Sequence, residues 1–590
     1  METVESIQGE CETYSYQKRK DSSITPSLPA FACTMSIPEL QWRIFRMVDL
    51  DWVPSRRKGT LLALALTCQS FSGPALDLLW RELDGLDPLI RCLPQSLWKL
   101  DKQQLEFQRA MTLDDWFTFC KYNHRVRSLD IRLTSYDSRP CRIGTEIWGT
   151  FGCPPFSLPL LPNLRSLTWD VPSGIYSYIR WFVTQNLTTL NIHAGGYEFK
   201  FGPSVQSILS CIPMLCPSLS HFHFYNHKES GDASIALQCW SHLISARTDQ
   251  ISDAAILHLS NLPSLRELHI DLHHIPIAAD TQKLLQRPVF CALQELDVTC
   301  YSLATSDAFF ETLSIAPKIL SFRIDEAEES PCALTASISR ISNACAHSAL
   351  EHLQMLVFFV DTVTPISAAA FQPLCASHNL RKLDFQSDYD AHLDHVALLQ
   401  MAKAWPLLEE LEIHGQHNSL WGNYPRLITP DAFVSLLKHC PRLTSVAIVI
   451  NWSAVDRCGI SPEIPYQGFA HGALSYADFN SSTIRHITGI AAFLSAIAPK
   501  LERVIGWGSD YHFDHPDFKK HSTKWNDVHH LVKAFSIVRE QGRGMALNAG
   551  VAVGDVGGSA DDSMENSASD GEHPSSSDQA SSEFEDSEEE

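Results

Sequence analysis

The chain has 590 residues, of which 44% are hydrophobic and 19% charged, and its formal net charge is −22. This hydrophobic fraction allows most of the chain to bury a core, and the length predicts three or four domains or one elongated array. The excess of 68 acidic over 46 basic residues argues against broad nucleic-acid binding, which needs a basic surface. Residues 551–590 hold thirteen Asp or Glu and no Lys or Arg, which leaves a net charge of only −9 for the other 550 residues.

The 17 cysteines are scattered through apolar segments, and none falls in a C-x-x-C pair. A zinc site needs ligands clustered at short spacings, so this distribution argues against a zinc domain and favours small buried side chains in a reducing compartment. No apolar core of a signal peptide is found near the N-terminus, and the longest apolar runs, at 61–68 and 490–498, are about half a membrane span. We therefore expect a soluble intracellular protein, cytoplasmic or nuclear, with no membrane partner.

Three helices are expected after residues 1–34, which lack periodicity and which we expect to be disordered. The first, SIPELQWRIFRMVD, begins at Ser36 with a proline in its first turn, the second is LLALALTCQSF at 61–71, and the third begins at Ser72. Three short helices bury only a marginal core. Their aromatic residues Trp42, Phe71 and Trp80 therefore predict a surface meant for a partner.

These helices resemble the F-box family, whose pattern is roughly Leu-Pro-x-Glu with an Ile several residues later, then Val-Cys-x-x-Trp, then Leu-Trp. The resemblance covers residues 36–83, and Ile37 and Phe71 replace the usual Leu and Trp of the family. In that family the F-box docks on a small Skp-type adaptor. The resemblance therefore implies adaptor contacts through Ile37, Pro38, Leu40, Ile44, Phe45, Cys68, Phe71, Leu79 and Trp80.

From about residue 126 to 505 a short phrase recurs with the spacing apolar-x-x-apolar-x-apolar. Examples are PNLRSLTWD at 162–170, PSLRELHI at 263–270 and NLRKLDF at 379–385; most copies start 23–35 residues apart, usually after a helical stretch. A strand and a helix repeated at this period resemble leucine-rich repeats of the irregular, intracellular kind. Because one unit cannot bury its apolar face alone, we expect an α/β solenoid with parallel strands on the concave side and helices on the convex side.

These patterns also set the expected domain boundaries. Two repeat intervals, 219–265 and 443–501, are too long for one unit and hold either insertions or poorly matching copies. After Arg543 the composition turns to Gly, Ser, Asp and Glu, which cannot offset the entropy of ordering. The expected organisation is a disordered segment at 1–34, an F-box at 35–95, a helical linker at 96–125, the solenoid at 126–540 and a disordered acidic tail at 541–590.

No pattern of catalytic residues is recognisable. The sequence contains no G-x-S-x-G elbow, no Walker loop and no H-E-x-x-H motif, and GRGMALNAG at 542–550 is interpreted as a flexible linker. Paired histidines such as His221 and His223 share one face of a strand and could bind a metal, but no third ligand is fixed, so a surface role is favoured. We expect a non-catalytic protein without a metal or a cofactor.

The outward strand positions of the predicted concave sheet are mostly acidic. Such a face attracts basic partners, so we hypothesise that it binds a basic segment of a client protein. A merely solvated acidic sheet is the alternative. The predicted client-binding positions are His221, His223, Tyr225, Glu267, His269, Asp271, Glu295, Asp297, Arg323, Asp325, Asp384, Glu410, Glu412 and His414.

An F-box followed by leucine-rich repeats resembles the substrate receptors of cullin–RING ubiquitin ligases. In that family the F-box binds the adaptor and the repeats hold the protein to be ubiquitinated, so the receptor supplies proximity and no bond chemistry. Two alternatives remain. The helices could instead only cap the solenoid of an interaction scaffold, since repeat arrays need covered ends, or an enzyme site could lie hidden in the fold.

Overall fold

The computed structural model describes residues 37–554 apart from 51–53, 133–141, 194–202, 226–232, 273–276, 287–288, 312, 328–330, 360–364, 388–390, 416–426, 461–462, 464 and 509–516. The disorder predicted for 1–34 and for 555–590 concerns segments outside the described residues. The chain divides into two compact units, one ending at Val532 and one beginning at Lys533.

The first unit begins with a bundle of three helices, α3 (Pro38–Asp49), α4 (Pro54–Thr67) and α5 (Gln69–Leu79). Pro38 lies in the first turn of α3, where a missing N–H leaves no hydrogen bond unmade. Three helices therefore occupy the expected region, but α4 and α5 begin earlier than the sequence pattern predicted. The bundle has a small core of its own, made of Phe45, Leu61, Ala65, Ala75 and Leu78.

The segment expected to be a helical linker at 96–125 is instead a β-hairpin followed by a helix. After β1 (Glu82–Leu83) and α6 (Asp87–Arg91), β2 (Trp98–Asp101) pairs antiparallel with β3 (Gln104–Phe107), and α7 (Leu113–Asn123) follows. The hairpin turn places Lys102 and Gln103 at positive φ angles of 46° and 65°. Such turns usually contain Asn or Gly, so the sequence carried no signal for this one.

Fifteen strands of the described chain form one sheet in which all neighbours are parallel and follow chain order. The α/β repeat architecture predicted from the sequence is therefore confirmed. The sheet already begins at β1, inside the range assigned to the F-box. Its other strands are β4 (Ser128–Arg132), β6 (Ser166–Asp170), β7 (Thr189–His193), β8 (His221–Tyr225), β9 (Ser245–Thr248), β10 (Glu267–Asp271), β11 (Glu295–Cys300), β12 (Ile319–Ala327), β13 (His352–Phe359), β15 (Lys382–Ser387), β17 (Glu410–Gly415), β18 (Ser445–Ala447), β19 (Tyr476–Asp478) and β20 (Arg503–Ile505).

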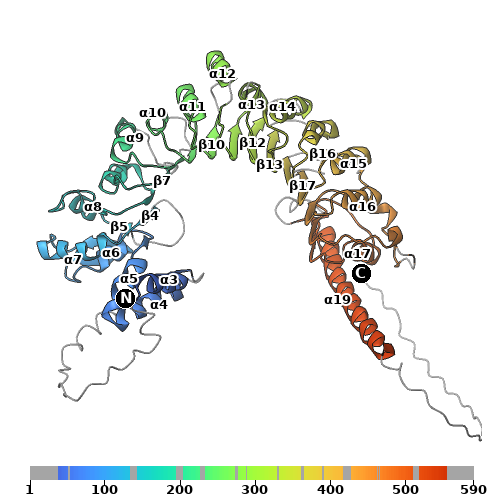
Figure 1. Cartoon of the computed structure of the whole chain (residues 1–590), viewed down its shortest axis with the longest axis horizontal. Helices are drawn as coiled ribbons and strands as arrows, with labels where there is room; N and C mark the ends of the chain where they lie inside the picture. The colour runs from blue at the N-terminus through green and yellow to red at the C-terminus, as the bar shows by residue number, and fades with distance from the viewer. Residues whose placement is uncertain are drawn as a thin grey trace, which may run out of the picture. The chain divides into compact units, whose positions relative to one another are not determined.

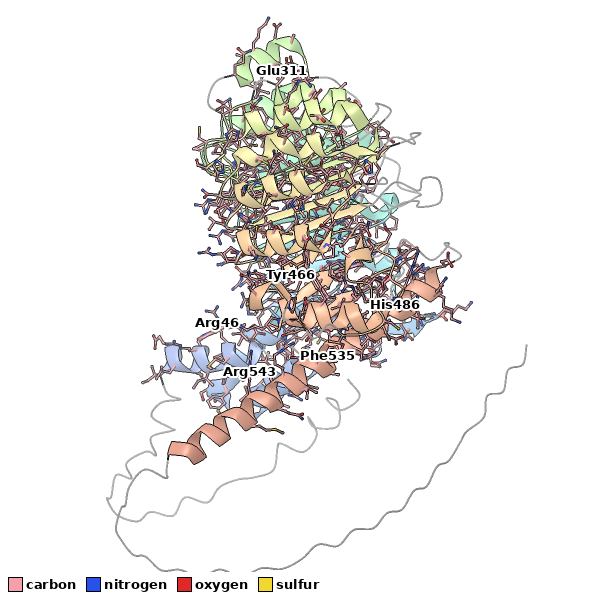
Figure 2. The ribbon with its side chains drawn as sticks, turned by 90° about the vertical axis from the view of Figure 1, so that its right-hand side faces the viewer. Arg46, Glu311, Tyr466, His486, Phe535 and Arg543 are labelled. Carbon is pink, nitrogen blue, oxygen red and sulfur yellow. The ribbon has the colours of Figure 1, made fainter. Side chains whose placement is uncertain are left out.

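Helices and 3-10 turns connect the strands and cover one face of the sheet, so that within this unit the strands lie on the inner side and the helices on the outer side (Figure 1). Figure 2 shows these layers stacked, from Glu311 after α13 to Tyr466 and His486 near the last repeats. The connecting elements are α8 (Thr145–Phe151), η1 (Ser173–Trp181), α9 (Pro203–Leu215), α10 (Ser234–Leu237), α11 (Asp253–Ser260), α12 (Ala279–Leu285), α13 (Leu303–Phe310), α14 (Pro331–Ala344), η2 (Ala368–Ala376), α15 (His395–Ala404), α16 (Pro430–His439), η3 (Trp452–Ala454), η4 (Pro465–Gly468) and α17 (Ile487–Ile497). Two short pairings, β14 (Ile366–Ser367) with β16 (Ala391–His392) and β3 with β5 (Arg142–Ile143), lie outside the main sheet.

The recurring apolar frame forms the core between sheet and helices. In the copy at 164–169, Leu164, Leu167 and Trp169 are all fully buried. The two long sequence intervals each contain one strand that the frame search missed, β9 and β19. In both strands the middle frame position is alanine, at Ala246 and Ala477, and both alanines are fully buried. These intervals therefore contain poorly matching copies of the repeat.

The C-terminal end of the sheet is covered by α19 (Phe518–Gly554), whose first part belongs to the first unit. Trp525 is buried there and donates a hydrogen bond to the carbonyl of Ser482 at 2.8 Å. A Cβ atom on Gly506 would overlap its indole ring. His529 Nδ1 accepts a hydrogen bond from Val504 N of the last strand at 3.3 Å, so a side chain occupies an edge group that could otherwise pair with another chain.

The same helix corrects the sequence prediction for the segment at 541–554. α19 continues through Gly554, so the described part of the predicted tail, including the predicted linker at 542–550, is helical. Alanine, methionine and leucine in this stretch favour a helix and offset its glycines.

We predict that Trp525→Ala lowers the free energy of unfolding of the first unit's C-terminal end by about 3 kcal/mol, because it leaves a cavity and the Ser482 carbonyl loses a donor. Protease resistance and thermal unfolding of the full chain report the change. Phe117→Ala is the control, since this aromatic side chain is 67% exposed. Equal effects of the two substitutions would contradict a capping role for the helix.

Candidate functional site

Helix α3 is apolar on two faces. One face points into the bundle core, with Phe45 fully buried and Val48 packed against the same cluster. The other carries Leu40, Ile44 and Met47, and Ile37 at the N-cap of the helix continues their helical spacing. Ile44 is 40% exposed and Met47 70% exposed. We call Ile37, Leu40, Ile44 and Met47 the α3 stripe.

The bundle core explains why this stripe is left outside. Phe45 meets Phe71 edge to face at 5.3 Å, and Gln41 Nε2 donates a hydrogen bond to the carbonyl of Ser70 at 3.1 Å. These two contacts fix the rotation of α3 against α5. Residues 3 or 4 apart share a helix face. Since Gln41 and Phe45 face α5, the residues of the α3 stripe cannot also face the core.

The structure separates the predicted adaptor contacts into exposed and buried groups. Ile37, Leu40 and Ile44 are exposed on the α3 stripe, and Cys68 is also exposed. Phe71 and Leu79 are half-buried against the core, and Pro38 begins α3. The sequence did not single out Met47, although its position seven residues after Leu40 could have placed it on the same face.

Phe45 and Trp80 are corrections to the predicted contact set. Phe45 is 0% exposed and forms the centre of the bundle. Trp80 is 8% exposed and stacks on Tyr122 of α7 at 4.6 Å. The apolar pattern marked both positions correctly as important, but it cannot distinguish a side chain that faces a partner from one that fills the core.

The outward positions of the long sheet form the second candidate surface. Side chains alternate along each strand, and in β8 and β10 they alternate between buried and half-buried. His221, His223 and Tyr225 face outward from β8, and Glu267, His269 and Asp271 do so from β10. The predicted register of the outward positions therefore holds at these strands.

The part of this face on β10 and β11 is acidic because carboxylates of the two strands lie in register. Glu267 of β10 lies beside Glu295 of β11, and His269 lies beside Asp297. His269 Nδ1 and an Asp297 carboxylate oxygen are 2.8 Å apart. Within the described chain no ion pair joins Glu267 or Glu295 to a cation, so the two like charges lie side by side.

Asp384 differs from the expectation of an accessible client-binding residue. It points to the outward face but is only 5% exposed. Gln354 Nε2 donates a hydrogen bond to its carboxylate at 2.7 Å, and Gln386 Nε2 donates another at 3.1 Å. The longer side chains of Gln354 on β13 and Gln386 on β15 therefore cover Asp384. The alternation of residues along a strand does not reveal such covering.

A polar cluster lies farther along the same face, on β15, β17 and β19. Lys382 and Glu410 form an ion pair at 2.6 Å. His414 Nδ1 lies 2.8 Å from Asn480 Oδ1, and its Nε2 lies 3.5 Å from the Glu412 carboxylate. Asn480 Nδ2 donates to the carbonyl of Ile413, so its oxygen must face His414, and both ring nitrogens of His414 then have acceptors.

The titration of this cluster follows from that geometry. Burial is the largest single influence on the pKa of His414 and lowers it, but the hydrogen bond to Glu412 and the charges of Asp478 and Glu412 outweigh burial and leave the pKa raised. The hydrogen bond from His414 lowers the pKa of Glu412. Burial raises the pKa of Asp478. Sequence reasoning missed Asp478 and Asn480 because β19, which ends at Asp478 two residues before Asn480, was not recognised.

The histidines of β8 are part of the polar face. His223 Nε2 lies 3.2 Å from Ser245 Oγ, and burial lowers the pKa of His223 to about 4, so its ring is neutral at neutral pH. His193 and Tyr225 stack at 4.8 Å. Among the residues that the structure describes, no group of three or more metal-binding side chains is close enough to hold an ion.

The remaining predicted positions lie on β12. Arg323 is exposed, and its Nε contacts an Asp325 carboxylate oxygen at 2.5 Å. The Arg323 guanidinium also lies 6.0 Å from the ring centre of Phe358 on β13. This pair is electrically neutral, so the centre of the face is less acidic than its flanks.

No helix in the described ranges is long and apolar enough to cross a membrane. No protein-family model matches the chain, and no curated protein matches it. Similar solved structures include a chain of the Rad7 and Elc1 complex in yeast, which is 13% identical with a TM-score of 0.30 and covers 69% of this chain and 98% of that chain. A chain of the TLR13–ssRNA13 complex is also 13% identical, with a TM-score of 0.28, and covers 71% of this chain and 62% of that chain.

We predict that Phe45→Ala lowers the free energy of unfolding by about 3 kcal/mol or more, whereas Ile44→Ala changes it by about 1 kcal/mol or less. The reason is that Phe45 fills the bundle core and Ile44 is largely exposed. Urea unfolding of the full chain, followed by near-ultraviolet circular dichroism, measures the difference. Similar losses for both variants would contradict the assignment of inner and outer faces.

We also predict that His414 stabilises the fold more at mildly acidic pH than at alkaline pH. Its folded-state pKa is raised, so its contribution is complete below the unfolded value of about 6.5 and is lost as the pH rises through the folded value. The difference in unfolding free energy between wild type and His414→Gln should therefore be largest below about pH 6.5 and should shrink as the pH rises above it. His242→Gln, at an exposed histidine, is the control and should follow wild type throughout.

Proposed function

We propose that this protein is a substrate receptor of a cullin–RING ubiquitin ligase, in which the helices at 38–79 dock on a Skp-type adaptor and the repeats hold a client protein. The observation that carries the proposal is the α3 stripe, which leaves an apolar surface on a module whose core is already complete without it. Contiguous exposed apolar surface of this kind marks a site for another protein. The module also occupies the part of the sequence that resembles an F-box.

In this function the protein forms and breaks no bond. Binding a client and an adaptor on one chain turns an encounter between separate molecules into a reaction within one assembly, which raises the effective concentration of the client lysine. A parallel sheet suits the task because its strands are held by their neighbours on both sides. The outward residues can therefore vary with the client without changing the core.

A second candidate function is that of an interaction scaffold whose helices only cap the repeats. Three contacts favour it. Trp80 stacks on Tyr122, and Arg125 pairs with Asp77 and donates a hydrogen bond to the carbonyl of Gly73. These contacts attach α5 to the first repeats as a cap would be attached. However, a capping unit needs a polar outer face, and the α3 stripe is apolar.

We predict that Leu40→Asp and Ile44→Asp each abolish co-purification of the full chain with a Skp-type adaptor, because a buried aspartate at the contact would lose its hydration without gaining a partner. Met47→Asp should weaken the same interaction. Quantitative pull-down with purified adaptor measures the loss, and circular dichroism verifies that each variant folds.

Phe117→Asp serves as the matched control, since it replaces an apolar side chain that is exposed on α7 and outside the α3 stripe. It should bind the adaptor like wild type. Retention of the adaptor by Leu40→Asp and Ile44→Asp would overturn the proposed docking, and failure of the wild type to bind any adaptor would favour the scaffold.

A further inference from the structure

The exposed side of helix α3 carries an arginine within its apolar surface. Arg43 lies three residues after Leu40 and four residues before Met47, so it adjoins both side chains on the helix. Leu50 follows Arg43 by two helical turns and is 80% exposed at the C-terminal end of the helix. Arg43 is therefore bordered by the α3 stripe along its length and by Leu50 beyond it.

Neither Arg43 nor Arg46 has an ion partner in the part of the chain that the structure describes. Both are exposed, and Arg46 lies at the surface of the helical bundle, three residues after Arg43 (Figure 2). Glu39 lies four residues before Arg43, a spacing at which helical ion pairs form, but no ion pair joins the two within the described ranges. Arg57, in contrast, pairs with Asp49 at 3.9 Å.

The place of each arginine in the helix determines what it contributes to the fold. Arg46 lies in the last turn of α3, where a cation stabilises the helix dipole. Arg43 lies in the middle of the helix, where this effect has faded, and it is not part of the bundle core. Folding therefore does not explain why a charged side chain interrupts the exposed apolar surface at Arg43.

Docking through the α3 stripe would cover Arg43 as well. A partner that contacts Leu40 and Met47 removes water from the side chain between them, and an arginine that loses water without gaining a partner costs free energy. A carboxylate compensates this loss well, because the planar guanidinium can donate two parallel hydrogen bonds to it. Charge complementarity therefore favours an acidic group on the partner.

We propose that the adaptor carries an acidic side chain that binds Arg43 at the edge of the apolar surface receiving the α3 stripe, and that Arg46 adds to the attraction. The inference deepens the proposed function and rests on it for the identity of the partner. The charge of the helical module supports it. Residues 38–79 contain five basic and four acidic residues, whereas the whole chain has a net charge of −22, so this module is the less repulsive part of the chain for an acidic protein.

An apolar helix face with arginines could instead lie on an anionic membrane surface. The net charge of −22 opposes this arrangement, since an anionic surface repels the chain as a whole. Co-sedimentation with vesicles of phosphatidylcholine and phosphatidylserine distinguishes the two. Vesicle binding by the wild type that is lost in Arg43→Glu would overturn the proposal.

The experiment measures the Kd of the full chain for a purified Skp-type adaptor at salt concentrations between about 50 and 500 mM. At low salt, Arg43→Gln should weaken binding about threefold and Arg43→Glu about tenfold, because the second change adds repulsion to the loss of attraction. Wild-type binding should weaken as salt is added, and this dependence should be smaller in Arg43→Gln. Arg43→Lys keeps the charge and should bind more tightly than Arg43→Gln.

Two further variants serve as controls. Lys121→Glu reverses an exposed basic residue on α7, outside the α3 stripe, and should leave the Kd unchanged. Ile44→Ala removes only apolar contact, so it should weaken binding by the same factor at every salt concentration. Circular dichroism verifies that each variant folds.

The outcomes separate this inference from the proposed function. If the wild type binds the adaptor but neither salt nor Arg43→Glu changes the Kd, the acidic contact is wrong while apolar docking stands. Tighter binding by Arg43→Glu, or equal weakening by Arg43→Glu and Lys121→Glu, would also overturn the contact. If the wild type captures no adaptor at any salt concentration, the ligase function and the inference fail together.

Discussion

The whole first unit depends on the stacking of one repeat against the next. Each strand of the sheet is only two to nine residues long. An isolated strand of that length is unstable, because its backbone groups and its apolar face stay in water. In the solenoid, both backbone edges of an inner strand pair with neighbours and the inward leucines meet the following helix. Buried hydrogen bonds between neighbouring repeats reinforce this stacking. Trp240 Nε1 donates to the carbonyl of Cys216, and Trp405 Nε1 donates to the carbonyl of Leu374. His471 Nε2 lies 3.1 Å from the carbonyl of Cys440.

The first and last repeats each lack one neighbour, and the two ends of the sheet are covered in different ways. At the C-terminal end, Trp525 and His529 of α19 cover the core and occupy an edge N–H. At the N-terminal end, β1 contributes only two residues, and the helical bundle is joined through Trp80 and Arg125. The bundle keeps its own small core, so it needs the solenoid only on one side. This independence is what frees the opposite side of α3 to remain apolar and available.

The sequence predicted those parts of the fold in which one physical cause determines the residue type. Three buried frame positions require large apolar side chains, so most strands of the sheet were found, whereas β9 and β19 escaped because Ala246 and Ala477 fill the middle position with less volume. The hairpin after α6 was missed because Lys102 and Gln103 give no turn signal at their positive φ angles. For the candidate surfaces, the difference between Phe45 and Ile44, or between Asp384 and Glu412, depends on which neighbours cover a side chain, and neighbours are fixed by packing between distant segments.

The two faces of the sheet are subject to different constraints, and this difference bears on where specificity can lie. A substitution on the face that packs against the helices must preserve side-chain volume, because the core between sheet and helices is close-packed. An outward position must only tolerate the strand conformation and its in-register neighbours, such as Glu267 beside Glu295. Keeping two like charges adjacent costs some stability that a neutral pair would not cost. Stacking of the repeats does not require this pair of charges, and a cationic group of another molecule placed beside Glu267 and Glu295 would relieve their repulsion.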